Sequence, residues 1–415
     1  MSVTGAQVLE PQALVRRDER RAAGVACGAH ALHDGYTDLI YVMLPVWQRE
    51  FGLGYAELGL LRGLFAGTMA TFQIPAGLIA ERLGAASVLA LGTALAGAGY
   101  CLAGASASFG LLLVALFVSG LGASTQHPLA SSLMARAFAG SRSMKVLGTY
   151  NFAGDIGKMT VPAAASLLLV VMSWRPALAL LGALGFVAAV AIFMLTPRYG
   201  AQAAPEQALP SAARADEPGS GGVSSAQGPP PRFAFPVLLS IGTLDSATRM
   251  GFLLFLPFVL TAKGASLPTI GLALTLVFAG GAAGKLVCAF IGARIGAVAT
   301  VWLTEGLTAV LIVTLLPLPL AAAMVLLPVI GVALNGTSSV LYGSVPDLVA
   351  PERRARAFSV FYTGTIGAGA VAPVIYGVIG DALGVPTALM IVAGILLLTL
   401  PLSLVLKPAL APRPL

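Results

Sequence analysis

The strongest constraint in this sequence is its series of long, continuously apolar runs. Twelve runs come close to the roughly 20 residues with which an α-helix crosses a bilayer core of about 30 Å. They are residues 23–47, 56–80, 86–104, 109–135, 146–170, 174–197, 235–262, 267–292, 297–317, 321–345, 357–380 and 386–406. Their continuity favours helices over transmembrane strands, in which polar and apolar residues would alternate. The predicted fold class is an all-α polytopic membrane protein.

Composition supports this interpretation and excludes most soluble classes. Of the 415 residues, 57% are hydrophobic and 10% are charged, whereas soluble domains carry about 25% charged residues. A soluble chain of this length would lack the charges needed to cover its surface. The sequence also has no GxSxG, HExxH, P-loop or CxxC pattern. We therefore expect neither an enzyme nor a bound cofactor, and place a polytopic membrane enzyme, a channel and a sensor well behind a transporter.

The apolar runs divide into two sets of six on either side of a polar stretch. Residues 198–234 are rich in proline and small polar residues, which predicts a disordered linker. The predicted organisation is a tail at 1–22, a six-helix half at 23–197, the linker, a second half at 235–406 and a tail at 407–415. Most of the 24 lysines and arginines fall in the tails and the even-numbered loops. The positive-inside rule then predicts that both tails face the cytoplasm, and this bias explains the net charge of +7 without a nucleic-acid partner.

The two halves also repeat each other in sequence. At an offset of 212 residues, HDGYTDLIYVMLPV (33–46) overlays DSATRMGFLLFLPF (245–258), and ERLG (81–84) overlays ARIG (293–296). At an offset of 210, GDIG (154–157) overlays GTIG (364–367). Parallel repeats of six helices are typical of transporters, whose substrate site lies between the halves near the bilayer midplane.

With twelve spans, a long central loop and basic loops after the second and eighth helices, the chain resembles the major facilitator superfamily. GLIAERLG (77–84) resembles a degenerate copy of that family's loop motif, so we single out Gly77, Glu81, Arg82 and the repeat-related Arg294 as gating candidates. GLGASTQHPLASSLMARAFAGSR (120–142) resembles the fosmidomycin-resistance branch of that family. This resemblance implies a proton-driven exporter that works as a monomer in a bacterial inner membrane. Here Leu129 follows His127-Pro128 where that branch carries an acid.

Ionisable residues inside predicted spans are costly and are therefore functional candidates. In the first span, His30, Asp34 and Asp38 share one face at spacings of four, and His33 lies beside them. Two carboxyl groups one turn apart in an apolar setting can bind and release a proton near neutral pH. We name Asp34, Asp38, Asp155 and Asp245 as proton-coupling candidates. The alternative for the first two is a structural pair with Arg249 or Lys285.

The remaining polar residues in the spans are substrate-binding candidates. They are His30, His33, Tyr36, His127, Asn151, Lys158, Arg249, Lys285 and Asn335. Asp155 and Lys158 could form an intrahelical pair, as could Asp245 and Arg249. His30, His33 and Asp34 suit a transition metal by type, but no further ligand lies close in sequence, and we expect no metal. The intramembrane cations suggest an anionic substrate. We expect proton-coupled efflux of such a small compound, with proton-coupled uptake of an organic acid as the alternative.

Overall fold

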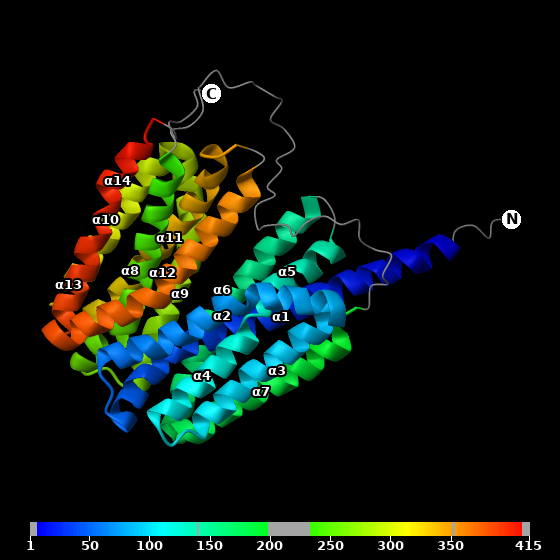
Figure 1. The fold of residues 1–415 in the computed structure, drawn as a ribbon, viewed down its shortest axis with the longest axis horizontal. Helices are drawn as coiled ribbons and strands as arrows, with labels where there is room; N and C mark the ends of the chain where they lie inside the picture. Colours follow the sequence, from blue (N-terminus) through cyan, green and yellow to red (C-terminus); the bar gives the residue numbers. More distant parts are fainter. Residues whose placement is uncertain (1–5, 139–140, 198–232, 351–352, 409–415) are drawn as a thin grey trace. The chain divides into compact units, whose positions relative to one another are not determined.

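The computed structural model describes residues 6–138, 141–197, 233–350 and 353–408, and helices dominate all four stretches (Figure 1). Before the central gap the helices are α1 (Ala6–Phe51), α2 (Tyr55–Leu83), α3 (Ala85–Gly104), α4 (Phe109–Ala123), α5 (Gln126–Ala137), α6 (Ser141–Val171) and α7 (Trp174–Leu195). After it come α8 (Ala234–Ala262), α9 (Leu267–Ile295), α10 (Ala297–Leu315), α11 (Leu320–Ser344), the 3₁₀ turn η1 (Val345–Asp347), α12 (Arg354–Leu383), α13 (Val385–Leu396) and α14 (Thr399–Leu406). These stretches contain no β-strand, so the predicted all-α class is confirmed.

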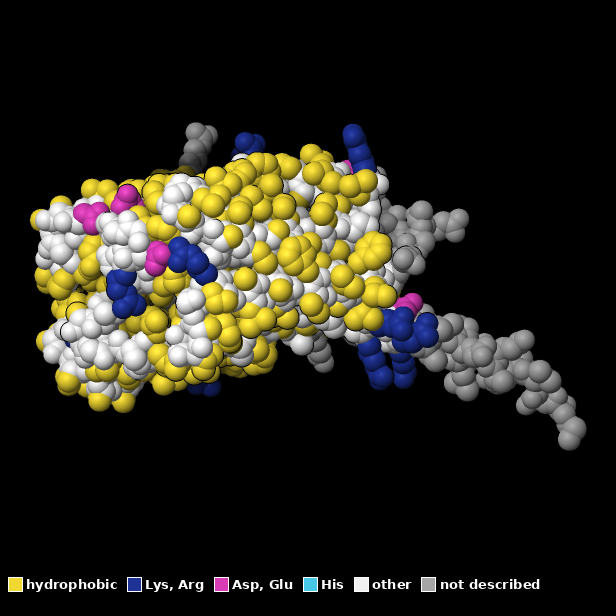
Figure 2. Space-filling view, turned by 90° about the horizontal axis from the view of Figure 1, so that it is seen from below, with side chains coloured by type: hydrophobic (Ala, Val, Ile, Leu, Met, Phe, Trp, Pro, Cys, Tyr) yellow, Lys and Arg dark blue, Asp and Glu magenta, His cyan; other side chains and the backbone are white. Residues whose placement is uncertain are grey.

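Hydropathy and length mark most of these helices as membrane spans. Eleven helical segments in the described stretches are long and apolar enough to cross a bilayer. They correspond to the predicted runs from 56–80 onward. The predicted first run lies in α1, which carries four buried ionisable residues, His30, His33, Asp34 and Asp38. Large apolar side chains are highly exposed, among them Val325 (77%) and Ile74 (76%). Figure 2 shows hydrophobic side chains over much of the visible surface, as expected for a surface that meets lipid.

Helix α1 is longer than the sequence predicted. The apolar run was expected to begin at residue 23, after a polar tail, whereas the helix begins at Ala6. Residues 12–23 contain mostly glutamine, alanine, leucine, glutamate and arginine, which all have high helix propensity. Because a polar sequence can be helical outside the membrane, the start of the apolar run marks entry into the bilayer rather than the start of the helix.

Two predicted spans are broken helices, and proline explains both breaks. The span predicted at 109–135 is divided into α4 and α5 at Ser124 and Thr125, four and three residues before Pro128. The last span is divided into α13 and α14 at Leu397 and Leu398, just ahead of Pro401. Proline lacks the N–H that would bond the carbonyl four residues earlier, and its ring collides with that carbonyl. Each break thus lies within one turn before a proline.

Helix contacts group the chain into two compact units. The first comprises Met1–Thr37, Thr71–Val161 and Trp174–Pro210, and the second Asp38–Ala70, Pro162–Ser173 and Ser211–Leu415. In the first unit α3 packs against α4, α5 and α7. In the second unit α9 packs against α11, and α8 packs against α12, α13 and α14. Each unit has its own apolar core. The division of the chain into two six-helix halves remains a prediction.

The sequence repeat at an offset of 212 has a structural counterpart. Helix α2 ends at Leu83 and α9 ends at Ile295, and each is followed by a glycine with a positive φ, 84° at Gly84 and 82° at Gly296. Only glycine adopts this conformation without strain, and the next helix begins directly after it in both places. The predicted linker at 198–234 lies outside the described residues, except for its last two positions.

Candidate functional site

The polar face of α1 forms a charged cluster around Asp34 in the first unit. The Asp34 carboxylate lies 3.4 Å from the Lys158 ammonium, 3.4 Å from Nε2 of His30 and 3.8 Å from Nε2 of His33. His30, His33 and Asp34 are each less than a tenth exposed. The structure thus joins four of the predicted site residues, from α1 and α6. Lys158 forms an ion pair with Asp34. The two residues lie far apart in the sequence, so local spacing did not predict this contact.

The hydrogen bonds of His30 fix where a proton must lie. Its Nδ1 lies 2.9 Å from the carbonyl oxygen of Tyr150, and because a carbonyl only accepts, Nδ1 carries the hydrogen. In a neutral imidazole, Nε2 then carries a lone pair and no hydrogen. This lone pair would face those of the Asp34 carboxylate and repel them. A proton on either His30 or Asp34 removes this repulsion.

All three histidines of the chain meet in this cluster. The His127 ring lies edge-on to the rings of His33 and His30, with centroids 4.8 Å and 5.5 Å apart, and His30 stacks on Tyr150 at 4.0 Å. His127 belongs to α5, directly after the break that precedes Pro128. The break at this proline thus positions the histidine beside α1.

The cluster has the donor types of a transition-metal site. Ligand atoms of His33, Asp34 and His127 lie within 4.8 Å of one another, wider than the spacing around a bound zinc ion. The Lys158 ammonium already lies against the same carboxylate. Because a dication would meet that positive charge, the geometry fits an anion or a proton better than a metal ion.

Two glycines of α6 allow this close approach. A Cβ on Gly154 would lie 2.6 Å from Oδ2 of Asp34 and 2.8 Å from Cε1 of His30. A Cβ on Gly157 would collide with the backbone of Ala31. Their positions bring α6, and with it Lys158, onto the polar face of α1.

A second charged pair lies in the second unit on α8. Arg249 donates from Nη2 to Oδ2 of Asp245 at 2.5 Å, and Asp245 is buried. This i, i+4 pair confirms one of the alternatives given by the sequence. Lys285 on α9 is half-buried. Asn335 on α11 donates to the carbonyl of Gly331 in its own helix.

The other candidate residues take varied positions. Asp38 and Asp155 are buried, at 5% and 7% exposure, whereas Asn151 is exposed. Tyr36 is buried, and its hydroxyl donates to the carbonyl of Leu181 on α7 at 2.5 Å, so this hydroxyl serves helix packing. Of the loop-motif candidates, Glu81 and Arg82 lie exposed at the end of α2 and Gly77 is half-buried in that helix; Arg294 is exposed at the end of α9.

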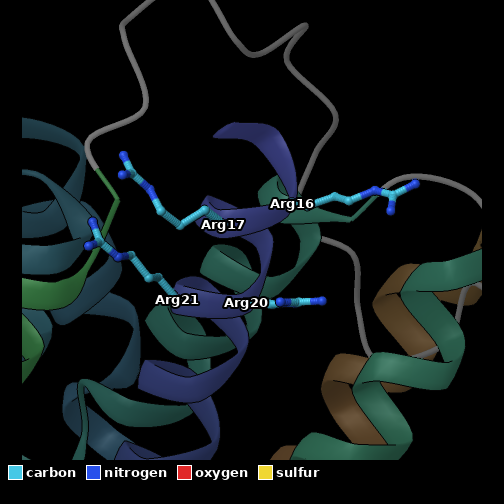
Figure 3. Close-up of a pocket in the computed structure, with 4 residues that line it drawn as sticks. All are labelled: Arg16, Arg17, Arg20 and Arg21. Atoms are coloured by element: carbon cyan, nitrogen blue, oxygen red, sulfur yellow. The ribbon is translucent and has the colours of Figure 1, made fainter. Parts of the chain in front are cut away.

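A separate surface hollow is lined by Arg16, Arg17, Arg20 and Arg21 of α1. Figure 3 shows Arg17 and Arg21 extending to one side of the helix, and Arg16 and Arg20 to the other. Because no two of them converge on a common point, we do not assign a ligand to this hollow. These arginines belong to the basic segment from which cytoplasmic orientation was predicted.

Sequence reasoning missed one buried cation. Arg62 was not among the candidates, but it is buried in α2 at 3% exposure and donates from Nε to the hydroxyl of Tyr41 at 3.0 Å. Its guanidinium also lies over the Tyr41 ring. Tyr150, which fixes His30 through a backbone carbonyl, was missed as well, because a carbonyl leaves no signature in sequence.

Comparison with known proteins assigns the fold to a family. The family model described as "Major Facilitator Superfamily" matches residues 26–247 and 238–415. Among curated relatives, the multidrug resistance protein MdtL of Shewanella oneidensis is 28% identical over 43% of this chain and 45% of its own length. The fosmidomycin resistance protein of Escherichia coli is 27% identical over 34% of each chain. The probable L-galactonate transporter of Escherichia coli is 24% identical over 62% of this chain and 56% of its own length. The chain thus spans about half or less of these relatives.

Solved structures share the fold over almost the whole chain. A bacterial homologue of the human lysosomal transporter Spinster, in an inward-facing and unoccupied conformation, has a TM-score of 0.76 at 16% identity, covering 94% of this chain and 97% of that one. The nucleoside transporter NupG (D323A mutant) has a TM-score of 0.73 at 15% identity, covering 93% and 99%. At such identities the likeness concerns the fold alone.

Proposed function

The chain belongs to the Major Facilitator Superfamily, and from this premise we propose that it is a proton-coupled secondary transporter of a small organic anion. The proposal places it in a bacterial inner membrane as a monomer, with both termini in the cytoplasm and alternating access between two six-helix halves. It needs no cofactor. The observation that carries it is the cluster in which Asp34 meets His30 and Lys158.

Proton binding and anion binding are linked at this cluster. With Asp34 ionised, the Lys158 ammonium is neutralised by the carboxylate at 3.4 Å. When Asp34 takes up a proton, this attraction is lost and Lys158 is available to an anionic substrate. An anion bound to Lys158 in turn favours the protonated form of Asp34. Each ligand therefore increases the affinity for the other, as linkage requires.

Positive linkage of this kind favours symport over antiport. An antiporter needs its two ligands to compete, whereas here the proton and the anion bind best together. The geometry therefore supports proton-coupled uptake, the alternative given by the sequence. The name of the L-galactonate relative refers to an anion of an organic acid, in agreement with this substrate class.

Efflux remains the second candidate function. It is favoured by the relatives named for multidrug resistance and fosmidomycin resistance. A compound that carries a positive charge would compete with the proton for Asp34 and would be exchanged for it. The charge of the substrate thus determines the direction of coupling in this site.

The test uses the purified protein in liposomes with a lumenal pH dye. With the external medium acidic, sugar acids, sulphonates and phosphonates are supplied one at a time. We expect one of these anions to accumulate in the lumen and to acidify it faster than the gradient alone does. The Lys158→Met variant should lose anion accumulation, while the matched Lys407→Met variant, at an exposed position outside the cluster, should retain it.

Two results would count against uptake of an anion. Lumenal alkalinisation that accompanies entry of a compound would identify antiport and favour efflux. Accumulation of the anion that is unchanged in Lys158→Met would remove the proposed role of this lysine.

A further inference from the structure

Both ring nitrogens of His30 face oxygen atoms, one on α6 and one on α1. Nδ1 lies 2.9 Å from the carbonyl oxygen of Tyr150 on α6, and Nε2 lies 3.4 Å from Oδ1 of Asp34, one turn along α1. The ring also stacks on the ring of Tyr150, with centroids 4.0 Å apart and an interplanar angle of 18°. His30 is 4% exposed. The imidazole thus bridges two helices inside the protein.

The number of hydrogens on the ring determines whether both contacts can be hydrogen bonds. A neutral imidazole has one N–H and one lone pair, so only one of its nitrogens can donate. With the hydrogen on Nδ1, the lone pair of Nε2 faces the Asp34 carboxylate. With the hydrogen on Nε2, the lone pair of Nδ1 faces the Tyr150 carbonyl oxygen. One further proton between Nε2 and Oδ1, on either atom, completes both hydrogen bonds.

Packing leaves the His30 ring little room to turn. A Cβ on Gly154 of α6 would lie 2.8 Å from Cε1 and 3.0 Å from Nε2 of His30, so the absence of a side chain there makes space for the ring. The Tyr150 ring covers one face, and the His127 ring lies edge-on with its centroid 5.5 Å away. A change in the number of ring hydrogens therefore changes the contact with α6.

The ionisable groups around His30 come from three helices of the first unit. They are His33 and Asp34 of α1, His127 of α5, and Tyr150, Asp155 and Lys158 of α6. Nε2 of His33 is 3.8 Å from Oδ1 of Asp34, too far for a hydrogen bond. Lys158 lies against the other carboxylate oxygen, Oδ2. Oδ1 is therefore shared with no closer nitrogen than that of His30 in the described contacts.

The other helices beside this part of α1 bring few charges. Helices α3 and α4 line a small cavity at His33 and contain no acidic, basic or histidine side chain. Helix α7 carries Arg175 near its N-terminus, where it donates to the carbonyl of Ser106. The end of α2 carries the exposed Glu81 and Arg82. The charge state of His30 is thus set mainly by Asp34 and Lys158.

We propose that the proton of the transport cycle is bound between Nε2 of His30 and Oδ1 of Asp34, and that its release breaks the bridge from His30 to α6. A hydrogen bond to a carboxylate is about twice as strong as one to a neutral carbonyl. The neutral ring left after release therefore keeps its hydrogen on Nε2, toward Asp34. Its Nδ1 lone pair then repels the carbonyl oxygen of Tyr150. The role in transport rests on the proposed function, whereas the bridge rests on the contacts of His30.

The step is a proton transfer in which nothing is oxidised. In the loaded site Nδ1 carries one hydrogen, and a second lies between Nε2 and Oδ1. On release the Nδ1–H bond breaks, its electron pair stays on Nδ1, and the proton passes to water. Water reaches the cluster at the Lys158 side chain, which is 30% exposed. Asp34 is left ionised, and its charge attracts Lys158 in place of an anionic substrate.

The bridge is tested by nitrogen-15 NMR of the full-length protein in lipid nanodiscs, without substrate. The chain has three histidines, all in this cluster, so histidine labelled in the ring gives three pairs of signals. The pair missing from the His30→Asn variant belongs to His30. We expect its Nδ1 to carry a hydrogen at low pH and to lose it within the range in which histidine titrates, about pH 5 to 8. An Nδ1 that keeps its hydrogen throughout, or never carries one, would overturn the proposal.

A second label keeps the test decisive if His30→Asn fails to fold. Tyrosine labelled with carbon-13 in its carbonyl group places a label beside Nδ1 of His30, the one histidine nitrogen that meets a tyrosine carbonyl in the described hydrogen bonds. The dipolar coupling between the two nuclei identifies His30 in the wild type. We expect this coupling to weaken as Nδ1 loses its hydrogen. A coupling that stays constant through the titration would show that the bridge does not open.

The role in coupling is tested separately, by the pH dependence of substrate exchange in liposomes. Asparagine at position 30 offers an amide N–H to Tyr150 but cannot titrate. Wild-type exchange should follow the hydrogen on Nδ1, and His30→Asn should lose this dependence, whereas Asp18→Asn, elsewhere on α1, should keep it. An unchanged dependence in His30→Asn would refute the coupling role. If no anion is transported while Nδ1 titrates, the proposed function fails and the proton site stands.

Discussion

At the scale of single residues, the cluster around Asp34 works through charge balance rather than through shape. His30, Asp34 and Lys158 meet within 3.4 Å contacts, so the charge of each depends on the protonation of the others. Removing one of these groups leaves the charges of the other two unbalanced. Substitutions here should therefore separate binding from energy coupling.

Asp34→Asn should uncouple transport from the proton gradient. Asparagine keeps the size of the side chain but cannot take up a proton, so Lys158 stays permanently available to the anion. We expect gradient-driven accumulation to fall to the level seen without a gradient, while exchange of labelled for unlabelled substrate continues. Asp18→Asn, on the same helix but outside the cluster, is the control. Full gradient-driven accumulation in Asp34→Asn would exclude Asp34 as the proton site.

The Asp34→Asn substitution should also change the thermal stability of the protein. In Asp34→Asn the Lys158 ammonium loses its carboxylate partner, although its side chain is 30% exposed and water offsets part of the loss. Adding Lys158→Met removes the cation that has lost this carboxylate. The double variant should therefore have a higher midpoint of thermal unfolding than Asp34→Asn alone. An equal or lower midpoint would mean that Lys158 has a stronger partner than Asp34.

Gly157→Ala should separate α6 from α1. The added Cβ would meet backbone atoms of Ala31, which cannot move aside as a side chain can, and overpacking of this kind costs about 1–3 kcal/mol. Gly148→Ala on the same helix is the matched control, because nothing lies within 4 Å of its Cβ position. Alanine there should stabilise the helix by up to about 1 kcal/mol. Equal effects on thermal stability in the two variants would refute the close contact.

At the scale of elements, α2 is held at its N-terminus by a carboxylate from α12. In the second unit, Asp381 accepts hydrogen bonds from the backbone N–H groups of Tyr55 at 2.7 Å and Ala56 at 2.9 Å. These donors have no partner inside the helix. Below this cap, Gly59 and Gly63 of α2 contact the backbone of α12. Because glycine has no side chain, these two positions allow the backbones of α2 and α12 to approach closely.

Asp381→Ala should weaken this contact more than a loss of surface charge would. Removing an N-cap acceptor costs about 0.5–2 kcal/mol, and the favourable interaction of a negative charge with the helix dipole is lost with it. Asp381→Asn keeps one acceptor oxygen and should be intermediate. Thermal unfolding of the two variants and of Glu81→Ala, at the other end of α2, measures the effect. If Asp381→Ala and Glu81→Ala have the same midpoint of thermal unfolding, Asp381 does not act as a cap.

The elements show how far sequence alone could predict this molecule. Hydropathy located the spans, because a membrane helix must satisfy its backbone internally and present apolar side chains to lipid. Local spacing also predicted the Asp245–Arg249 pair. It could not choose Asp34 as a partner of Lys158, since an equally good local candidate, Asp155, was present.

At the scale of the whole molecule, the two copies of the repeat share backbone features but differ in their side chains. The helix ends at Gly84 and Gly296 match at an offset of 212, yet His33 in the first copy corresponds to Asp245 in the second. In our proposal the first copy binds a proton at Asp34, whereas the corresponding helix of the second copy carries the Asp245–Arg249 ion pair. The duplicated fold thus carries different chemistry in its two copies.

The predicted orientation follows from the distribution of lysine and arginine over the entire chain. Arg16, Arg17, Arg20 and Arg21 precede the first span, and further basic residues follow the even-numbered spans, including Arg82 and Arg294. Positive residues are retained on the cytoplasmic side during insertion. A green fluorescent protein fused after Leu415 should therefore fluoresce in a bacterial host. Alkaline phosphatase fused after Gly264, between α8 and α9, should be active, because we expect that turn to reach the periplasm.

The converse fusions complete this test. Phosphatase fused after Gly84, between α2 and α3, should be inactive, because this turn follows an even-numbered span and carries Arg82. Active phosphatase at Gly84 together with inactive phosphatase at Gly264 would invert the topology. Because the proton and substrate gradients set the direction of symport, either orientation would allow the proposed uptake, and the fusions decide only which turns face the cytoplasm.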